Sequence, residues 1–198
     1  MFPHEDEGFM NEKYRIEKLG KEEFRDYWNK YKFKVFEDDH SYHFWDLVSD
    51  DEKNQISELR KPLESLIEIR LAIFNEKDEF VGWSWGFQES HTTFYVANSA
   101  ILPEYRRKGL YTMLLNRMLD ESISLGFQLI YSRHCATNNE IIIPKLKRGF
   151  IISKMEVDDV FGVLVHLHFY VNETRRLIMD YRAGQRKPNE KIKALFKL

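Results

Sequence analysis

Cysteine is almost absent from this chain. Among its 198 residues only Cys135 carries a thiol, so no disulfide can form within one chain and no cluster of cysteine ligands can hold zinc. Glycine and proline are also scarce, at nine and five residues, which excludes collagen-like and low-complexity structure. The sequence therefore predicts a globular protein of a reducing compartment, which we expect to be the cytoplasm.

Long hydrophobic runs are missing as well. The longest mostly apolar stretch, residues 161–171, contains two histidines and is far shorter than the roughly 20 residues that cross a bilayer. The first 20 residues have no basic start followed by an apolar run, so no secretory signal is expected. We therefore expect no membrane partner.

Neither sign of charge dominates the whole chain, but the charges are unevenly placed. Thirty basic and 32 acidic side chains give a net charge of −2, which does not favour a nucleic-acid partner. Residues 175–198 carry +6, so the rest of the chain carries −8. We interpret residues 173–198 as a basic C-terminal helix and tail that follow a domain of residues 1–172. A solvated tail, or one that docks on an acidic partner or nucleic acid, would fit this charge.

The hydrophobic period changes along the chain in the order of a mixed sheet covered by helices. Strands are expected over residues 13–18, 68–74, 80–87, 92–102, 127–134, 150–157 and 160–171. Helices are expected over residues 21–36, 43–67 (broken at Pro62), 110–126, 138–148 and 173–183, with a loose chain after residue 184. In the last strand the apolar residues from 161 to 171 alternate onto one face. This order predicts an α/β fold (an α+β mixed sheet) with a central twisted sheet of about seven strands and helices on both faces.

One strand-to-helix junction, residues 101–112, is the strongest candidate for a binding site. A basic loop with one glycine separates the end of a strand from the start of a long helix. The N–H groups in the first turn of a helix have no partner within it and attract anions. Gly109 lets the backbone approach a bulky anion such as a pyrophosphate, and three basic side chains precede it. An ordinary turn with solvated basic residues is the alternative.

The stretch 103–115, PEYRRKGLYTMLL, resembles the acyl-CoA-binding motif of the GNAT superfamily of N-acetyltransferases, Arg/Gln-x-x-Gly-x-Gly/Ala. Arg106 and Gly109 match this motif, while Tyr111 stands where glycine or alanine is usual. A second family signature is an asparagine, a helix and then a Gly-Phe pair. Asn138 and residues 149–150 match it. The resemblance covers roughly residues 13–171 and implies the family's acyl-CoA N-acyltransferase fold.

The resemblance also implies acetyl-CoA as the acyl donor and no metal. The backbone of Ala100 and Ile101 would pair with the pantetheine arm, and the N–H of Ile101 would polarise the thioester carbonyl. Asn138 would hydrogen-bond the same arm. The pyrophosphate would be held by the backbone N–H groups of Arg107, Lys108, Gly109, Leu110, Tyr111 and Thr112, with Arg106 beside them.

In this family a neutral amine attacks the acetyl carbonyl directly and CoA thiolate leaves. A tyrosine four residues before the Gly-Phe pair often protonates the sulfur, and here Lys145 takes that place. Lys145 would donate a proton, offset thiolate charge, contact a CoA phosphate or point to water, and we expect one of the last two. His134 is the candidate base because histidine titrates near neutral pH. A histidine with only local hydrogen bonds is the alternative.

Three other features have weaker functional interpretations. Cys135 follows His134 directly, and adjacent strand residues point to opposite faces, which argues against a Cys-His nucleophile. His166 and His168 have a spacing compatible with a metal, but no carboxylate lies on their strand, so we expect sheet-surface residues and no metal. The family resemblance implies that the region between the first two helices lines the acceptor pocket, where the run 42–46 would form an acidic, aromatic lip that suits a cationic amine. Core packing of its aromatic residues is the alternative.

These features favour an N-acetyltransferase that moves the acetyl group of acetyl-CoA to a primary amine of a small molecule or a protein. The second hypothesis is a non-catalytic acyl-CoA-binding module, because Lys145 replaces the usual acid. The third is a nucleic-acid-associated factor that uses the basic tail. Dimers are common in the family, so a homodimer is a further expectation.

Overall fold

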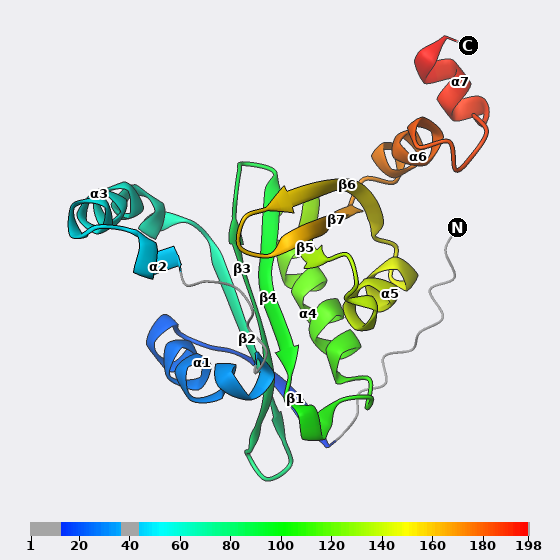
Figure 1. The fold of residues 1–198 in the computed structure, drawn as a ribbon. Coiled ribbons are helices and arrows are strands. Elements are labelled where there is room, and N and C mark those ends of the chain that lie inside the picture. Colours follow the sequence, from blue (N-terminus) through cyan, green and yellow to red (C-terminus); the bar gives the residue numbers. More distant parts are fainter. Residues whose placement is uncertain (1–12, 37–43, 198) are drawn as a thin grey trace. The chain divides into compact units, whose positions relative to one another are not determined.

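The computed structural model describes residues 13–36 and 44–197, and Figure 1 shows their helices and strands. Seven strands form one sheet in the order β1-β2-β3-β4-β5-β7-β6. The strands are β1 (Tyr14–Lys18), β2 (Glu68–Asn75), β3 (Phe80–Gln88), β4 (Thr93–Ile101), β5 (Leu129–Cys135), β6 (Ile151–Asp158) and β7 (Gly162–Tyr170). β4 and β5 pair in parallel, whereas β1–β2, β2–β3, β5–β7 and β6–β7 pair antiparallel. The predicted mixed sheet is confirmed.

The helices agree with the predicted order, with differences at their ends. They are α1 (Lys21–Val35), α2 (Phe44–Leu47), α3 (Asp50–Arg60), α4 (Leu110–Ser124), α5 (Asn139–Lys147), α6 (Glu173–Arg182) and α7 (Glu190–Phe196), with short 3-10 turns η1 (Lys61–Ser65) and η2 (Pro103–Tyr105). The predicted helical region 43–67 is three pieces. A capping box between Ser49 and Glu52 starts its long helix, and Pro62 lies in the 3-10 turn that ends it.

The expected loose chain after residue 184 is wrong, because α7 forms there. The side chain of Asn189 accepts a hydrogen bond of 2.9 Å from the N–H of Ile192 and so caps the first turn. Ile192 is also buried, which gives the short helix a packed side.

The chain forms two compact units. One consists of the described residues up to 87 together with 96–121, and the other of residues 88–95 and 122–197. In the first unit the aromatic face of α1 covers part of β2 and β3. Phe80 stacks on Tyr27 and Tyr31, with ring centroids 4.5 and 4.8 Å away. The buried cluster there contains Leu19, Phe24, Ala72, Phe74, Phe80, Trp83, Ala100 and Leu102.

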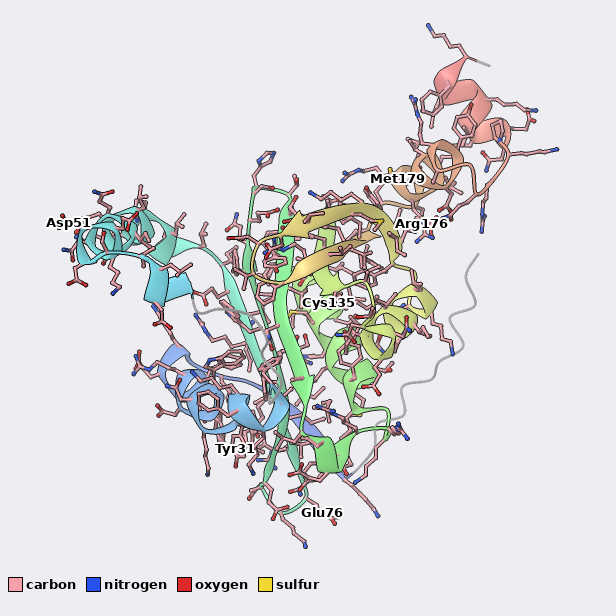
Figure 2. The ribbon with its side chains drawn as sticks, viewed as in Figure 1. Tyr31, Asp51, Glu76, Cys135, Arg176 and Met179 are labelled. Atoms are coloured by element: carbon pink, nitrogen blue, oxygen red, sulfur yellow. The ribbon has the colours of Figure 1, made fainter. Side chains whose placement is uncertain are left out.

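In the second unit, β5 lies beside β7, and β7 lies beside the edge strand β6. The predicted apolar alternation in β7 is confirmed only in part, since Val165 and Leu167 are buried but Phe161 and Val163 are exposed. The helix α6 packs on β7 and carries Arg176 and Met179, both labelled in Figure 2. Arg176 donates to the carbonyl of Gly149 and, over 2.8 Å, to the buried carboxylate of Asp180.

Candidate functional site

The junction between β4 and α4 has an open backbone at its glycine. Arg107 and Gly109 both adopt left-handed conformations, with φ of 62° and 76°. A side chain at Gly109 would meet no atom within 4 Å, so nothing in the described structure fills the space in front of it. The N–H groups of residues 110–112 begin α4 and have no carbonyl within the helix to receive them. Such a helix start attracts anions, and the binding of a pyrophosphate here stays a prediction.

The basic side chains of this loop are exposed, but two of them also contact the loop itself. Arg106 donates from Nε to the carbonyl of Ile101 over 3.2 Å. Lys108 donates to the carbonyl of Glu104 over 3.3 Å, and its amine lies 5.1 Å from the ring centre of Tyr105. Arg106 therefore fixes the last peptide of β4. The predicted contacts of these side chains with a cofactor stay predictions.

Gly82 positions the end of β4, a role that was not predicted from the sequence. A side-chain carbon at Gly82 would lie 2.4 Å from the carbonyl oxygen of Ala100 and 2.8 Å from a side-chain carbon of Ile101. Only glycine allows β3 and β4 to approach this closely. A glycine inside an otherwise bulky strand is a known sign of close backbone approach and was the available signal. It sets the backbone of the two residues predicted to bind pantetheine.

Tyr111 differs from the family motif and is half-buried. Burial of its phenol raises the pKa of Tyr111.

The second unit contains three polar side chains from β5 and α5 that are linked by hydrogen bonds inside the protein. Lys145 is 1% exposed, and its amine lies 2.6 Å from the hydroxyl of Ser132. The Nε2 atom of His134 lies 2.8 Å from the same hydroxyl. A charged lysine can only donate, so Ser132 accepts from Lys145. The Lys145 amine also lies 5.0 Å from the ring centre of Phe150, which favours its charged form.

Burial determines the protonation states of Lys145 and His134. It lowers the pKa of Lys145 from 10.5 to about 7. The pKa of His134 falls to about 3, first because the imidazole is buried and second because Lys145 is nearby. Lys145 therefore exchanges its proton near neutral pH, whereas His134 is neutral there.

These positions correct one expectation and weigh against another. Lys145 does not point to water, because the folded chain buries its amine against β5. His134 hydrogen-bonds locally, and a group with a pKa of about 3 is a weak proton acceptor at neutral pH. Its role as a base stays a prediction that this burial disfavours. Ser132 was not singled out in the sequence, although a hydroxyl inside the apolar strand 127–134 was a signal.

Asn138 lies immediately before α5 and is exposed. Its N–H donates to the carbonyl of Cys135 over 2.9 Å, and its side chain makes no capping hydrogen bond to α5. Its predicted contact with the pantetheine arm stays a prediction. Cys135 is exposed at the end of β5 (Figure 2), and its thiol lies 3.8 Å from the carbonyl oxygen of Phe161. His134 binds Ser132 instead, which supports the argument against a Cys-His pair.

Of the two histidines of β7, His166 does not lie on the sheet surface as expected, and His168 is half-buried. His166 is buried, and its Nε2 contacts the carboxylate of Glu156 on the neighbouring strand β6. The same carboxylate accepts from Arg133 over 3.1 Å. Burial lowers the pKa of His168 to about 4. The sequence missed this partner because it comes from another strand. Across residues 13–36 and 44–197 no group of three or more His, Cys, Asp or Glu residues is arranged to hold a metal.

The expected acceptor lip at residues 42–46 lies partly outside the described residues. Of the two tryptophans of β3, Trp83 is a core residue and donates to the side chain of Asn98 over 2.9 Å. Trp85 is half-buried and donates to the carboxylate of Glu68 over 3.1 Å.

The model of the acetyltransferase (GNAT) family matches residues 13–150, which is more than half of the chain. This chain belongs to the GNAT acetyltransferase family. No curated protein matches it. The fold of this GNAT protein is found in solved structures of low sequence identity.

Mutant forms of the spermidine/spermine N-acetyltransferase SpeG from Vibrio cholerae share 17% identity and a TM-score of 0.59, over 86% of this chain and 99% of theirs. The protein yncA from Salmonella typhimurium, in a structure with acetyl-CoA, shares 16% identity with this chain at a TM-score of 0.59, over 80% of this chain and 94% of its own. A protein from Acinetobacter baylyi shares 14% identity with this chain at a TM-score of 0.59, over 80% of this chain and 93% of its own. Within the described ranges of the GNAT protein, no helix is both long and apolar enough to span a membrane.

Proposed function

We propose that this GNAT protein transfers the acetyl group of acetyl-CoA directly to a primary amine. The observation that carries the proposal is the open left-handed loop at Gly109, followed by the start of α4. This loop offers backbone N–H groups to a pyrophosphate at the place where the family binds its donor. Solved neighbours include a complex with acetyl-CoA and one with CoA and spermine, which supports the same donor here.

In this proposal the first unit binds and orients the donor. The N–H groups of residues 107–112 hold the pyrophosphate, with Arg106 beside them. The backbone of Ala100 and Ile101, set by Gly82 and by the Arg106 contact, pairs with the pantetheine arm. The N–H of Ile101 then stabilises the negative charge that develops on the thioester oxygen.

In the second unit, Asn138 is proposed to bind the pantetheine arm and Lys145 to supply a proton. When the amine nitrogen bonds to the acetyl carbon, the carbon–sulfur bond breaks and sulfur keeps the electron pair. Lys145 would give its proton to that sulfur, in the role of the family's tyrosine, and the acylated nitrogen would release one proton to the solvent as the amide forms. A pKa of about 7 suits an acid that works at neutral pH. The hydrogen bond to Ser132 holds the amine in position.

The proposed acceptor is a small-molecule amine, and spermidine is the first compound to test. Among the solved neighbours are spermidine/spermine N-acetyltransferases, one of them in complex with CoA and spermine. The charge of −8 outside residues 175–198 favours a cationic acceptor. A protein amine is the second acceptor class. The amine must arrive uncharged, because only a neutral amine can attack the carbonyl.

Donor binding is tested by the thermal shift of the purified protein with acetyl-CoA and with CoA. A ligand that binds only the folded state raises the melting temperature with concentration. The variant Gly109→Glu fills the open space with an acidic side chain and should abolish the rise. Gly126→Glu is the matched control, since Gly126 ends the same helix with φ of 92° and equally open space. No shift of the parent protein at millimolar acetyl-CoA would overturn the donor assignment.

Transfer is tested separately by mass spectrometry of spermidine and a panel of other amines incubated with acetyl-CoA. An acetylated product with stoichiometric free CoA supports the enzyme. Tight donor binding with no acceptor turned over would favour the alternative, a non-catalytic acyl-CoA-binding module.

A further inference from the structure

The turn between β2 and β3, where Figure 2 labels Glu76, holds a carboxylate in place through hydrogen bonds. The side-chain oxygen of Asn75 accepts from the N–H groups of Lys77 and Glu79, over 2.9 Å each. The side-chain nitrogen of Asn75 donates to the carboxylate of Glu79 over 2.6 Å. The backbone closes the same turn, because the N–H of Asn75 donates to the carbonyl of Glu79. The turn therefore fixes the position of the Glu79 carboxylate.

Tyr105 reaches this carboxylate from the junction between β4 and α4. Its hydroxyl donates to Glu79 over 3.1 Å and lies 3.4 Å from the side-chain nitrogen of Asn75. Both contacts can form together, because a phenol donates one hydrogen bond and can accept another. Asn75 and then Tyr105 lower the pKa of Glu79, so the acceptor is a charged carboxylate at neutral pH. The ring of Tyr105 packs against the buried cluster that contains Leu102.

The other side-chain hydrogen bonds of residues 103–109 end on the junction itself. Arg106 donates to the carbonyl of the last residue of β4, and Lys108 donates to the carbonyl of Glu104. Within the described residues, Tyr105 is the residue of this loop whose side chain hydrogen-bonds to a distant part of the chain. The loop is thus attached through Tyr105 to the turn between β2 and β3.

We propose that Tyr105 is a positioning residue for the donor, because it fixes the loop before Gly109 against the turn between β2 and β3. This inference rests on the proposed function, in which the loop and the start of α4 hold the pyrophosphate of acetyl-CoA. Arg107 has a left-handed backbone, which a non-glycine residue keeps only when its surroundings hold it there. A loop that is held in its binding conformation loses less entropy when the ligand binds.

The hydroxyl and the ring of Tyr105 make separate contributions that two substitutions distinguish. Tyr105→Phe removes the contact with Glu79 and keeps the ring, above which the amine of Lys108 lies 5.1 Å from the ring centre. Tyr105→Leu removes both contacts. Glu79 is exposed, so water competes for its hydrogen bonds. We expect the Kd for acetyl-CoA to rise about two- to fivefold in Tyr105→Phe, and further in Tyr105→Leu.

Isothermal titration of the full chain with acetyl-CoA measures these changes. Glu79→Ala removes the acceptor and should weaken binding at least as much as Tyr105→Phe. Adding Tyr105→Phe to the Glu79→Ala variant should then change nothing more, because both substitutions remove the same hydrogen bond. Tyr27→Phe is the matched control. It removes a hydroxyl from another half-buried tyrosine of the same unit, whose ring stacks on Phe80, and it should bind acetyl-CoA as the parent does.

Two further readouts separate positioning from a general loss of stability. In hydrogen exchange without ligand, the amides of residues 105–109 should exchange faster in Tyr105→Phe than in the parent and in Tyr27→Phe. In turnover, Tyr105→Phe should raise the KM for acetyl-CoA and leave kcat at saturating donor unchanged. A substitution that only destabilised the fold would lower the melting temperature without this change in KM.

The outcomes distinguish this inference from the proposed function. A parent chain that does not bind acetyl-CoA would overturn the proposed function and the role of Tyr105 with it. A parent that binds acetyl-CoA, with Tyr105→Phe and Glu79→Ala binding it equally well, would overturn the role of Tyr105 alone. Unchanged hydrogen exchange at residues 105–109 would do the same. Circular dichroism of each variant verifies folding.

Discussion

The burial of Lys145 predicts a stability that rises with pH, and Lys145→Met should remove this dependence. Methionine keeps an unbranched apolar side chain and loses the amine. In the unfolded chain the lysine holds its proton up to its ordinary pKa of 10.5, whereas in the folded chain it loses it near 7. Between these values the unfolded state binds one more proton, so the free energy of unfolding of the parent increases with pH.

The size of the effect follows from the same two values. Each unit of pKa difference corresponds to about 1.4 kcal/mol, so the parent should gain about 3 kcal/mol from this group between pH 7 and 9. Below pH 7 the lysine is protonated in both the folded and the unfolded chain. Its buried charge then lowers the parent's free energy of unfolding by about 5 kcal/mol relative to high pH. The methionine variant avoids this cost, so it should be more stable than the parent at pH 6. The lost hydrogen bond to Ser132 reduces this gain in stability by about 1 kcal/mol.

Urea unfolding of both proteins at pH 6, 7, 8 and 9 measures this difference. The exposed lysine of the same helix provides the control, since Lys147→Met should leave the parent's slope unchanged. Equal slopes for the parent and Lys145→Met would refute the reasoning. They would mean that the amine is hydrated in the folded state.

Three further changes have expected outcomes. Ser132→Ala removes the acceptor of the buried amine and should cost about 1–3 kcal/mol in urea unfolding; no loss of stability would count against the hydrogen-bonded chain. Gly82→Ala would press on the carbonyl of Ala100, so it should lower the unfolding free energy by at least 1–3 kcal/mol and weaken acetyl-CoA binding in a thermal-shift titration. Unchanged binding would show that β4 tolerates displacement. Asp180→Asn removes the charge that Arg176 contacts and should lower the melting temperature, and a shift of less than about 1 °C would contradict its structural role.

The features that could be predicted from the sequence are those that depend on residues close together in the chain. The junction at Gly109 and the helix between Asn138 and Gly149 combine local turn signals with a family resemblance, and the predicted strands occur with small shifts at their ends. Alternation in the last strand correctly identified one face, but it cannot show whether another element covers that face. For this reason the exposure of Val163 was not predicted.

The burial and protonation of Lys145 depend on contacts with residues that are distant in the sequence. Its partner Ser132 is 13 residues away on a different element, and only folding brings them together. The carboxylate beside His166 came from β6 in the same way. The helix α7 was missed for a local reason, because its seven residues offer too short an apolar pattern even though Asn189 is a good cap.

The contact between Arg176 and the carbonyl of Gly149 has a practical consequence for shortening the protein. A chain that stops at residue 172 would lose this donor and leave the carbonyl that follows α5 without it. The loss would fall at the end of the helix that holds Lys145. Proteolytic trimming or a tag inserted at this boundary should therefore disturb the interior, and a shortened chain is best cut after α6, beyond Arg182.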